Sequence, residues 1–535
     1  MNEKKAFLKG AIILTLANII SKILGAIFKI PLTYVLKEEG MAVFNTASCV
    51  YSIFLTFVVS GIPLAISRLV ASDYALKRPQ DATKTTVTAT RLLFTLGLFG
   101  SLALFALSTP LAIAMKDPAA ALSIKMIAPS VFFVAVGCVY KSFFQGTANM
   151  IPTAISQVVE SMIRLVAGFF AAYMLIESPV FLKTAGATVG VTIGELIATL
   201  ILFLLYLFTK KESAKKSTLT YKKILSDISA VAVPMLFSSI ILSALNMLDV
   251  ATVRNQLLRI SFTPETARRF LIRFSSYTNL FDNLFETLKL SASGARWLYG
   301  AYSGYALTIF HLPLGVLATL GVTILPIITS NLAKNNMAGV RSVSKNAITL
   351  TLFLSVPFAV LFFTVGDMAL KLLFNNTASA TMLAFVSPCL VFLALSQLFS
   401  SILYSSGKIV EPFLIQFIGT VIKIIGNLIL VPIPSLHIYG AILSSTVSFS
   451  FSALLEWRLI RKTFGLRLKS ADILPFFICA VPMYAVSALT KEPLNIILGS
   501  NFWALVSCAL LSVFAYILSI SFFFPKGFGF LKKNK

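Results

Sequence analysis

The chain has 535 residues, of which 57% are hydrophobic and 12% are charged, and its formal net charge is +25. A soluble globular protein carries about 25% charged residues, so this composition excludes a soluble domain, a coiled coil, a disordered scaffold and a disulfide-stapled secreted domain. The basic excess alone would suit a nucleic-acid binder. Most basic residues, however, stand in segments between apolar runs, and we predict no nucleic-acid partner.

Apolar segments of about 20 residues, the length that crosses a hydrocarbon core of about 30 Å, recur along the whole chain. In lipid the backbone must satisfy its own hydrogen bonds, so such segments form helices. The sequence therefore predicts an all-α integral membrane protein with about fourteen transmembrane helices. The predicted spans are 7–34, 42–64, 85–115, 122–144, 151–176, 185–208, 228–253, 298–328, 347–370, 381–404, 413–431, 438–459, 474–489 and 503–524.

The basic residues between these spans predict their orientation. With the amino terminus in the cytoplasm, the cytoplasmic segments hold 26 Lys and Arg and the short outer loops hold five. Because Lys and Arg in short loops mark the cytoplasmic side, we expect both termini in the cytoplasm. The first span contains Lys22 and Lys29 and is followed by many others, so we expect a membrane helix there and not a cleaved signal peptide.

The outer segment 254–296 carries seven basic residues. Long loops are translocated largely regardless of charge, so this segment does not change the predicted orientation. Thr263, Pro264 and Glu265 are typical of a helix start. We expect a linker helix on the membrane surface, and a gate over the outer mouth is the alternative.

An internal repeat joins two distant parts of the chain. Spans four and five recur six spans later, and an even number of intervening spans gives both copies the same orientation. Parallel repeats of this type build transporters from two halves with the substrate between them. The sequence therefore predicts two six-helix lobes related by pseudo-two-fold symmetry, plus two C-terminal helices. The pairs that keep an offset of 259 residues include Pro129 and Pro388, Gln157 and Gln416, and Arg164 and Lys423.

The predicted domains follow from this repeat. An N-terminal lobe covers 1–210, and a basic cytoplasmic linker covers 211–227. The C-terminal lobe covers 228–462 and includes the insert 254–296, and residues 463–535 hold the last two helices and a cytoplasmic tail.

A few basic residues fall deep within predicted spans. A charged side chain at mid-bilayer costs about 2.5–3.5 kcal/mol on insertion scales and usually faces a water-filled cavity. Lys and Arg bind phosphate groups well, so we predict that these cations bind an anionic substrate such as pyrophosphate in a central cavity. The predicted substrate ligands are Lys22, Lys29, Arg164 and Lys423.

Other polar residues share helix faces with these cations. Asn18 lies one turn before Lys22 on the first span, and Glu160 lies one turn before Arg164 on the fifth. Glu160 and Arg164 are spaced to form an ion pair, so a self-neutralising pair that joins helices is the alternative to a binding role. Arg68, near a span end, would instead reach the headgroups by default. The predicted polar residues of the cavity are Asn18, Gln157, Glu160, Gln416 and Arg68.

The acidic residues that we assign to spans are Glu160, Glu195 and Asp249. Asp249 follows Asn246 by one turn and could bind a coupling cation or proton, or form a salt bridge. Glu195 stands in a glycine-rich segment, where helix packing is an equally good interpretation. The predicted ion-coupling residues are therefore Asp249, Asn246 and Glu195, with Na⁺ or H⁺ as the ion.

The sequence shows no catalytic motif and no metal-ligand set. The five cysteines all fall inside predicted spans without CxxC spacing, and His311 and His437 are isolated. No phosphate-binding loop, GxSxG or HExxH motif occurs in a supporting context. We predict that the protein is not an enzyme and has no catalytic residues, no metal site and no cofactor beyond the coupling ion.

Four sequence blocks resemble one transporter family. The longest is YKSFFQGTANMIPTAISQVVESMIR (140–164), and SKILGAIFKIPLTYVL (21–36) is similar to the family's first helix. SGIPLAISRLVA (60–71) and LYGAYSGYALTIFHLPLGV (298–316) resemble further blocks. The chain thereby resembles, over essentially its whole length, the stage V sporulation protein B and polysaccharide-transporter family, part of the MOP flippase superfamily that includes the MurJ-like lipid II flippases.

The resemblance implies a V-shaped, two-lobed bundle in a bacterial cytoplasmic membrane. It implies alternating-access transport of undecaprenyl-pyrophosphate-linked sugars, with the peptidoglycan precursor lipid II as the leading cargo. Lys22 falls at a basic position of the family's first-helix motif and Lys29 lies close to a second, and the last two helices would hold the lipid tail. The second-helix arginine typical of lipid II flippases has no clear match, because Arg68 stands later in its helix.

Three alternatives remain at this stage. The cargo could be another polyprenyl-linked oligosaccharide, such as a capsule or teichoic-type polymer. A MATE-type cation or drug antiporter would need acids in its cavity, and an enzyme of lipid-linked sugar synthesis would need a carboxylate cluster at the membrane surface. The expected partners are a polyprenyl-pyrophosphate-linked glycan and membrane lipid, with a monomeric protein and cell-wall synthesis proteins as candidate associates.

Overall fold

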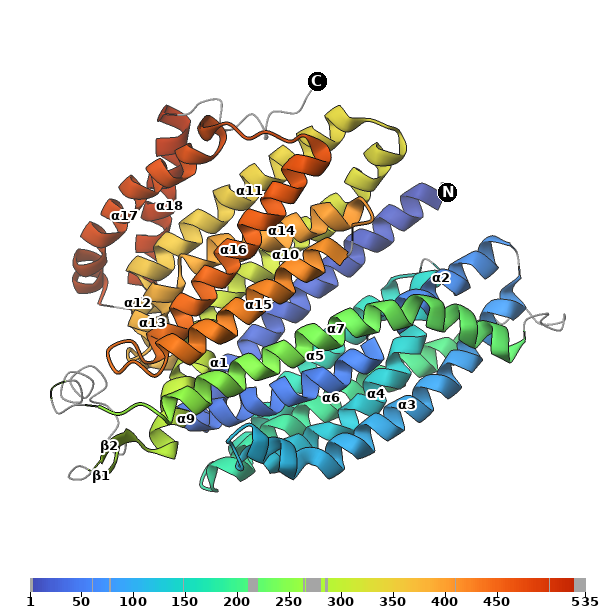
Figure 1. The fold of residues 1–535 in the computed structure, drawn as a ribbon, viewed down its shortest axis with the longest axis horizontal. Helices are drawn as coiled ribbons and strands as arrows, with labels where there is room; N and C mark the ends of the chain where they lie inside the picture. Colours follow the sequence, from blue (N-terminus) through green and yellow to red (C-terminus); the bar gives the residue numbers. More distant parts are fainter. Residues whose placement is uncertain are drawn as a thin grey trace. The chain divides into compact units, whose positions relative to one another are not determined.

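The computed structural model describes residues 3–59, 61–76, 78–147, 149–209, 220–262, 265, 281–283, 287–408, 410–499 and 501–523. In these residues the regular elements are helices, apart from one short antiparallel pair of strands (Figure 1). The chain divides into two compact units, Met1–Arg254 and Asn255–Lys535.

The first unit is entirely helical in its described part (Figure 1). Proline stands in the first turn of α2, α3 and α5, where its fixed φ suits a helix and its missing N–H costs no hydrogen bond. The helices are α1 (Glu3–Val59), α2 (Ile62–Ala75), α3 (Pro79–Ala114), α4 (Ala120–Gly146), α5 (Ile151–Met174), α6 (Val180–Phe208) and α7 (Tyr221–Leu257).

Helix α1 is two helices joined at a kink. Lys37 has φ 54° and ψ −170°, which is not helical. The first two predicted spans, 7–34 and 42–64, lie on either side of this residue. The break therefore lies where the sequence predicts a short loop. In the structure the loop is reduced to a kink at this one residue.

The second unit begins with a hairpin and continues with helices. Strand β1 (Phe281–Asn283) pairs with β2 (Thr287–Leu290). The helices are α9 (Ala292–Gly300), the π-helix η1 (Ala301–Ala306), α10 (Leu307–Ala333), α11 (Met337–Thr364), α12 (Gly366–Phe374), α13 (Ala380–Val386), α14 (Cys389–Ser405), α15 (Val410–Leu430), α16 (Ile438–Phe464), α17 (Ser470–Leu498) and α18 (Asn501–Phe523).

The protein is a multi-pass membrane protein by the length and composition of these helices. Among the described residues, eleven helices are long and apolar enough to cross a membrane, or twelve if the bent pair α13 and α14 forms one span. The sequence predicts about fourteen. The difference arises because α1 counts once, although it covers two predicted spans, and because α7, the seventh predicted span, is not among the eleven.

The two copies of the internal repeat form the same order of helices. Helices α4, α5 and α6 in the first unit correspond to α13 with α14, α15 and α16 in the second. The copies differ at their shared proline. Pro129 lies inside the continuous helix α4, whereas Pro388 stands between α13 and α14, which meet at a 45° bend.

Parts of the predicted domain scheme lie outside the described residues. These parts are most of the basic linker, the helix start at Thr263 and Pro264, residues 266–280 and the C-terminal tail. The ends of the insert 254–296 are described: its first residues belong to α7, and its last residues form β2 and the start of α9. The units divide after Arg254, so α7 belongs to the first unit, and the lobe boundary at 211–227 stays a prediction.

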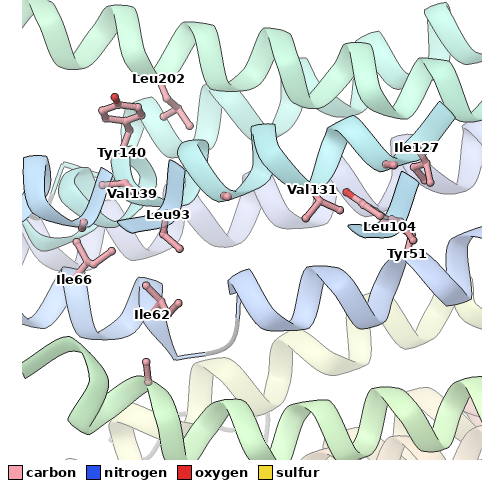
Figure 2. Close-up of a cluster of buried hydrophobic side chains, with 14 of the residues drawn as sticks. Tyr51, Ile62, Ile66, Leu93, Leu104, Ile127, Val131, Val139, Tyr140 and Leu202 are labelled. Carbon is pink, nitrogen blue, oxygen red and sulfur yellow. The ribbon is translucent and has the colours of Figure 1, made fainter. Parts of the chain in front are cut away.

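Each unit has its own apolar core. Figure 2 shows part of the first, in which Tyr51 of α1, Leu93 of α3, Val131 of α4 and Leu202 of α6 are buried together. The second core gathers buried residues of α10, α11, α14, α16, α17 and α18. Buried interhelical packing of this type holds the polar side chains of each unit in defined positions.

Candidate functional site

Helix α5 carries the polar face that the sequence predicts. Gln157, Glu160 and Arg164 follow each other at intervals of three and four residues, so they lie on one side of the helix. Arg164 Nη2 donates to Glu160 Oε1 at 2.5 Å. The ion pair expected from the i, i+4 spacing is therefore present in the structure.

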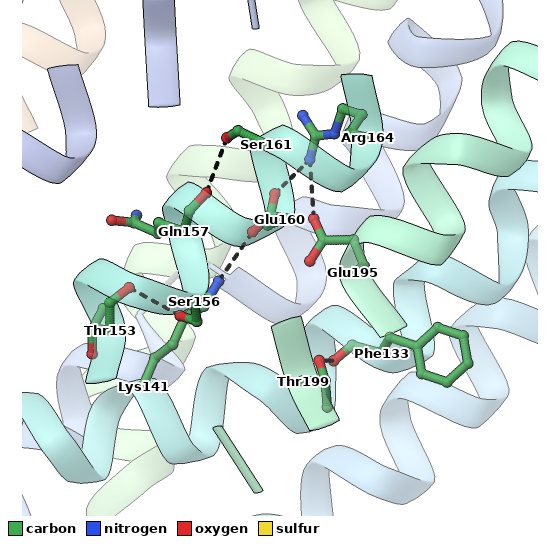
Figure 3. A network of polar contacts seen from close by, with 10 residues as sticks. All are labelled: Phe133, Lys141, Thr153, Ser156, Gln157, Glu160, Ser161, Arg164, Glu195 and Thr199. Atoms are coloured by element: carbon green, nitrogen blue, oxygen red, sulfur yellow. Dashed lines mark hydrogen bonds and ion pairs between the residues drawn. The ribbon is translucent and has the colours of Figure 1, made fainter. Parts of the chain in front are cut away.

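Two further charges from neighbouring helices join this pair (Figure 3). Lys141 Nζ of α4 lies 3.5 Å from Glu160 Oε2, and Arg164 Nη2 lies 3.4 Å from Glu195 Oε1 of α6. The side chains of Glu160 and Glu195 are only 13% and 10% exposed. We call these four residues the charge cluster; it contains two cations and two acids, and its formal net charge is zero.

Glycines in α6 bring this helix close enough to α5 for the contact between Glu195 and Arg164. A Cβ on Gly190 would lie 2.2 Å from the backbone of Gly168 in α5, and one on Gly194 would lie 3.0 Å from the Glu160 carbonyl oxygen. Gly194 directly precedes Glu195, so the close approach places that carboxylate against α5. The glycine-rich segment thus serves helix packing, and this packing forms the charge cluster.

The charge cluster keeps some unused hydrogen-bonding capacity. Arg164 Nε and Gln157 Oε1 are buried and have no hydrogen-bond partner among the described residues. Near the charge cluster, Thr199 of α6 donates to the Phe133 carbonyl oxygen of α4 at 2.8 Å and so joins α4 to α6 directly (Figure 3). Arg164 is thus held by two carboxylates through Nη2, while its buried Nε donates to none of the described residues.

The predicted cations of α1 stand apart from the charge cluster. Lys22 is exposed, Lys29 and Asn18 are partly buried, and neither lysine forms an ion pair with a described residue. Arg68 is exposed on α2, a separate helix from the second half of α1. The structure therefore does not join Arg164 to the other proposed ligands of the first unit by any direct contact that it describes.

The remaining predicted residues lie in other places. Lys423 of α15 lies 6.0 Å from the ring centroid of Phe449 in α16, and Gln416 donates to Ser396 and Glu456 in the second unit. Asn246 and Asp249 lie on α7, the first exposed and the second partly buried. Glu195, the third predicted ion-coupling residue, belongs to the charge cluster instead.

Sequence reasoning missed two residues that the structure places among polar partners. The count of 26 cytoplasmic basic residues includes Lys141 as a loop residue. The acids that the sequence analysis assigns to spans do not include Glu456. Both fall inside predicted spans, 122–144 and 438–459. A charged residue within a span is itself a sign of polar partners on other helices. The partner of Lys141 is 19 residues away in the sequence, and the partners of Glu456 are 40 or more residues away. No helical spacing therefore connects either residue to its partners.

Comparisons with known proteins agree with this architecture. The family model of the polysaccharide biosynthesis protein matches residues 7–258, and the MatE family model matches residues 301–429. Stage V sporulation protein B of Bacillus subtilis (strain 168) is 23% identical over 495 residues, which cover 91% of this chain and 90% of the relative. Lipid II flippase MurJ of the same organism is 22% identical and covers 86% of this chain and 83% of its own length.

Solved structures show the same fold. Lipid II flippase MurJ in an inward closed conformation has a TM-score of 0.67 at 14% identity and covers 96% of this chain and 99% of its own. An inward-facing multidrug resistance MATE transporter of the MOP superfamily has a TM-score of 0.65 at 13% identity, with 83% and 94% covered. The chain is thus similar in sequence to the polysaccharide biosynthesis protein family and shares the fold of MOP-superfamily transporters.

These similarities confirm several expectations. The family resemblance read from the sequence blocks is correct, and the all-helical multi-pass architecture is that of MOP transporters. The names of these similar proteins describe transport and lipid flipping, which agrees with the prediction of a transporter that is not an enzyme. The predicted site residues and the lobe boundaries stay predictions.

Proposed function

We propose that this MOP transporter is a flippase for a lipid-linked cell-wall precursor, with lipid II as the leading cargo. It would carry the undecaprenyl-pyrophosphate-linked sugar across a bacterial cytoplasmic membrane by alternating access. The observation that carries the proposal is the presence of Lys22 and Lys29 on α1 without an ion-pair partner among the described residues. Two relatives named for sporulation and for lipid II flipping, aligned over most of their length, support it.

The chemistry of α1 suits a pyrophosphate. Lys22 and Lys29 are seven residues apart, about two helical turns, so they lie on one face. Each would cost free energy in an apolar setting without an opposite charge. A pyrophosphate supplies that charge, and lysine is a good point-charge ligand for phosphate oxygens.

Arg164 would play a conditional part in this site. Its guanidinium is held by Glu160 and Glu195, so an anion must compete with two carboxylates for it. Both carboxylates contact Nη2, and Nε is a buried donor that they leave unused. We therefore propose Lys22 and Lys29 as the main pyrophosphate ligands and Arg164 as a ligand that requires the charge cluster to open; Lys423 remains a proposed ligand of the second unit.

Other finer features belong to the same proposal. Both termini would lie in the cytoplasm, and the fourteen spans would include both halves of α1 as well as α7. Helices α17 and α18 would hold the lipid tail, which is supported by exposed apolar side chains such as Val481 and Leu510. The protein would act as a monomer, with cell-wall synthesis proteins as candidate associates.

Alanine replacement of the α1 lysines tests the proposed site. Lys22→Ala and Lys29→Ala should each reduce translocation of labelled lipid II by proteoliposomes at least tenfold, because each removes a charge from the pyrophosphate. The same variants should fail to rescue a flippase-depleted bacterial strain while inserting in the membrane at the normal level. Lys334→Ala, which removes an exposed lysine after α10, is the matched control and should transport normally.

Full transport by both α1 variants would contradict the pyrophosphate site. Transport of a different polyprenyl-pyrophosphate-linked oligosaccharide, with lipid II as a poor competitor, would instead favour a capsule or teichoic-type cargo, because both cargoes present the same pyrophosphate. Export of cationic drugs without any lipid transport would favour a MATE-type antiporter, since multidrug resistance MATE transporters share this fold.

A further inference from the structure

A buried carboxylate in the second unit accepts a hydrogen bond from Gln416, one of the residues predicted to line the cavity. Glu456 of α16 is 0% exposed. Its carboxylate accepts hydrogen bonds from Ser400 Oγ at 2.6 Å, from Ser396 Oγ at 2.7 Å and from Gln416 Nε2 at 3.1 Å. The serines belong to α14 and the glutamine to α15, so three helices meet at this group.

All three donors are neutral. Gln416 also donates to Ser396 Oγ at 2.7 Å, which fixes the donors relative to one another. None of the hydrogen-bond or ion-pair partners of Glu456 among the described residues is a cation. The carboxylate is therefore well supplied with hydrogen bonds but has no adjacent opposite charge.

The internal repeat shows how this difference arises. The same offset of 259 residues that relates Pro129 to Pro388 relates Lys141 to Ser400. In the first unit Lys141 contributes a positive charge beside Glu160, whereas in the second unit Ser400 contributes a neutral hydroxyl to Glu456. At the position that corresponds to Lys141, the second unit thus has a neutral hydroxyl beside a carboxylate where the first unit has a cation.

Other ionisable groups on the helices packed against α16 are distant or unsuited to titrate near neutral pH. Tyr404 of α14 lies within electrostatic range of Glu456, and a phenol ordinarily titrates near pH 10. Cys389 of α14 and Lys423 of α15 stand seven residues from Ser396 and Gln416, about 10 Å along each helix. On α11, Arg341 donates to a backbone oxygen, and Lys345 pairs with Asp472 of α17.

An isolated ionised carboxylate in such a place is costly, and in practice a group of this kind takes up a proton. Serine hydroxyls both donate and accept, so Ser396 and Ser400 can bond to the ionised or the protonated acid. Their oxygens are 2.6–2.7 Å from the carboxylate oxygens, which is direct hydrogen-bond distance. A metal cation would have to separate these atoms, whereas a proton would not.

We propose that Glu456, Ser396, Ser400 and Gln416 form a proton-binding site, at which the Glu456 carboxylate takes up one proton to become a neutral carboxylic acid and releases it again. The protonated acid stabilises the packed arrangement of α14, α15 and α16, and loss of the proton leaves an unbalanced charge among them. Proton exchange is therefore coupled to the packing of the second unit. This inference does not depend on the identity of the transported lipid.

Infrared spectroscopy of the full-length protein in lipid nanodiscs tests the site directly. Wild-type protein at neutral pH should show a carbonyl stretching band of a protonated carboxylic acid that disappears as the pH is raised. Glu456→Gln should lose the part of that band that corresponds to one carboxyl group per molecule, because glutamine keeps the shape but cannot ionise. Glu411→Gln, which removes a partly exposed acid paired with Lys408, is the matched control and should leave the band unchanged.

Two outcomes would overturn the proposal. One is an identical carboxylic-acid band in wild-type protein and Glu456→Gln. The other is a wild-type band that disappears at fixed pH when choline chloride is replaced by NaCl, which would mean that Na⁺ occupies the site. If Glu456→Gln does not fold, Ser400→Ala provides the second test, since loss of a donor to the carboxylate should shift the pH at which the band disappears to a higher value.

Discussion

Replacing Arg254 with alanine should lower the free energy of unfolding by about 3–5 kcal/mol, the usual cost of removing one partner from a buried ion pair. Arg254 and Asp117 are 4% and 1% exposed at the side chain, and Arg254 Nη1 lies 2.5 Å from Asp117 Oδ2. Arg254 also donates to Thr46 Oγ1 at 2.9 Å. The substitution would leave the Asp117 charge buried without a counter-ion.

The Arg254 contacts join three parts of the first unit. They connect the end of α7 to α1 and to the turn between α3 and α4, where the Lys116 carbonyl oxygen accepts a further hydrogen bond at 3.3 Å. The measurement is the unfolding midpoint in a mild detergent as denaturant is raised. Arg259→Ala, which removes an exposed arginine five residues later, is the control and should change the midpoint little.

Equal midpoints for Arg254→Ala and Arg259→Ala would show that the buried pair contributes nothing to stability. Replacing both partners, as in Arg254→Met with Asp117→Leu, separates two sources of the lost stability. One is the lost attraction within the ion pair, and the other is the cost of leaving Asp117 buried without a counter-ion. The double variant should recover part of the stability, because it leaves no unpaired buried charge.

Replacing Gly190 with alanine should lower the free energy of unfolding of the first unit by about 1–3 kcal/mol or more. This is the usual cost of forcing extra atoms into a packed core. The added Cβ would lie 2.2 Å from the Gly168 backbone. A flexible side chain could relieve such a clash by changing its rotamer, but backbone atoms cannot. Helices α5 and α6 would have to separate. The contact between Arg164 and Glu195, now 3.4 Å long, should lengthen with them.

The matched control for Gly190→Ala is Gly25→Ala. A Cβ on Gly25 would meet nothing within 4 Å, and alanine favours a helix over glycine by about 0.8–1.0 kcal/mol. Gly25→Ala should therefore leave stability unchanged or raise it slightly, as measured by the thermal unfolding midpoint. A Gly190→Ala protein as stable as this control would mean that the helices do not pack as closely as the structure has them.

The sequence could predict the features that depend on one helix at a time. Hydropathy located the membrane helices, because lipid requires long apolar segments in which the backbone bonds to itself. The interval of four residues predicted the pair of Glu160 and Arg164, since a regular helix sets their spacing. The sequence blocks also identified the superfamily, because they retain recognisable family patterns.

Contacts between helices could not be predicted in the same way. Lys141 and Glu456 were misassigned although both stand within predicted spans, because their roles depend on which side chains face them from other helices. Arg254 was counted as part of an outer segment, yet it is buried against Asp117, which is 137 residues away in the sequence. No periodic pattern along the chain encodes such a pair.

The amino-acid sequence by itself determined that this protein is an all-helical, multi-pass membrane protein, because hydropathy and helical spacing are local properties. Only the tertiary structure decided which of its buried charges are balanced. Close packing at Gly190 and Gly194 brings Glu195 of α6 to Arg164, which already pairs with Glu160, whereas Glu456 in the second unit has only neutral donors around it. Electrostatic balance depends on distances between helices, and these arise only when the helices pack.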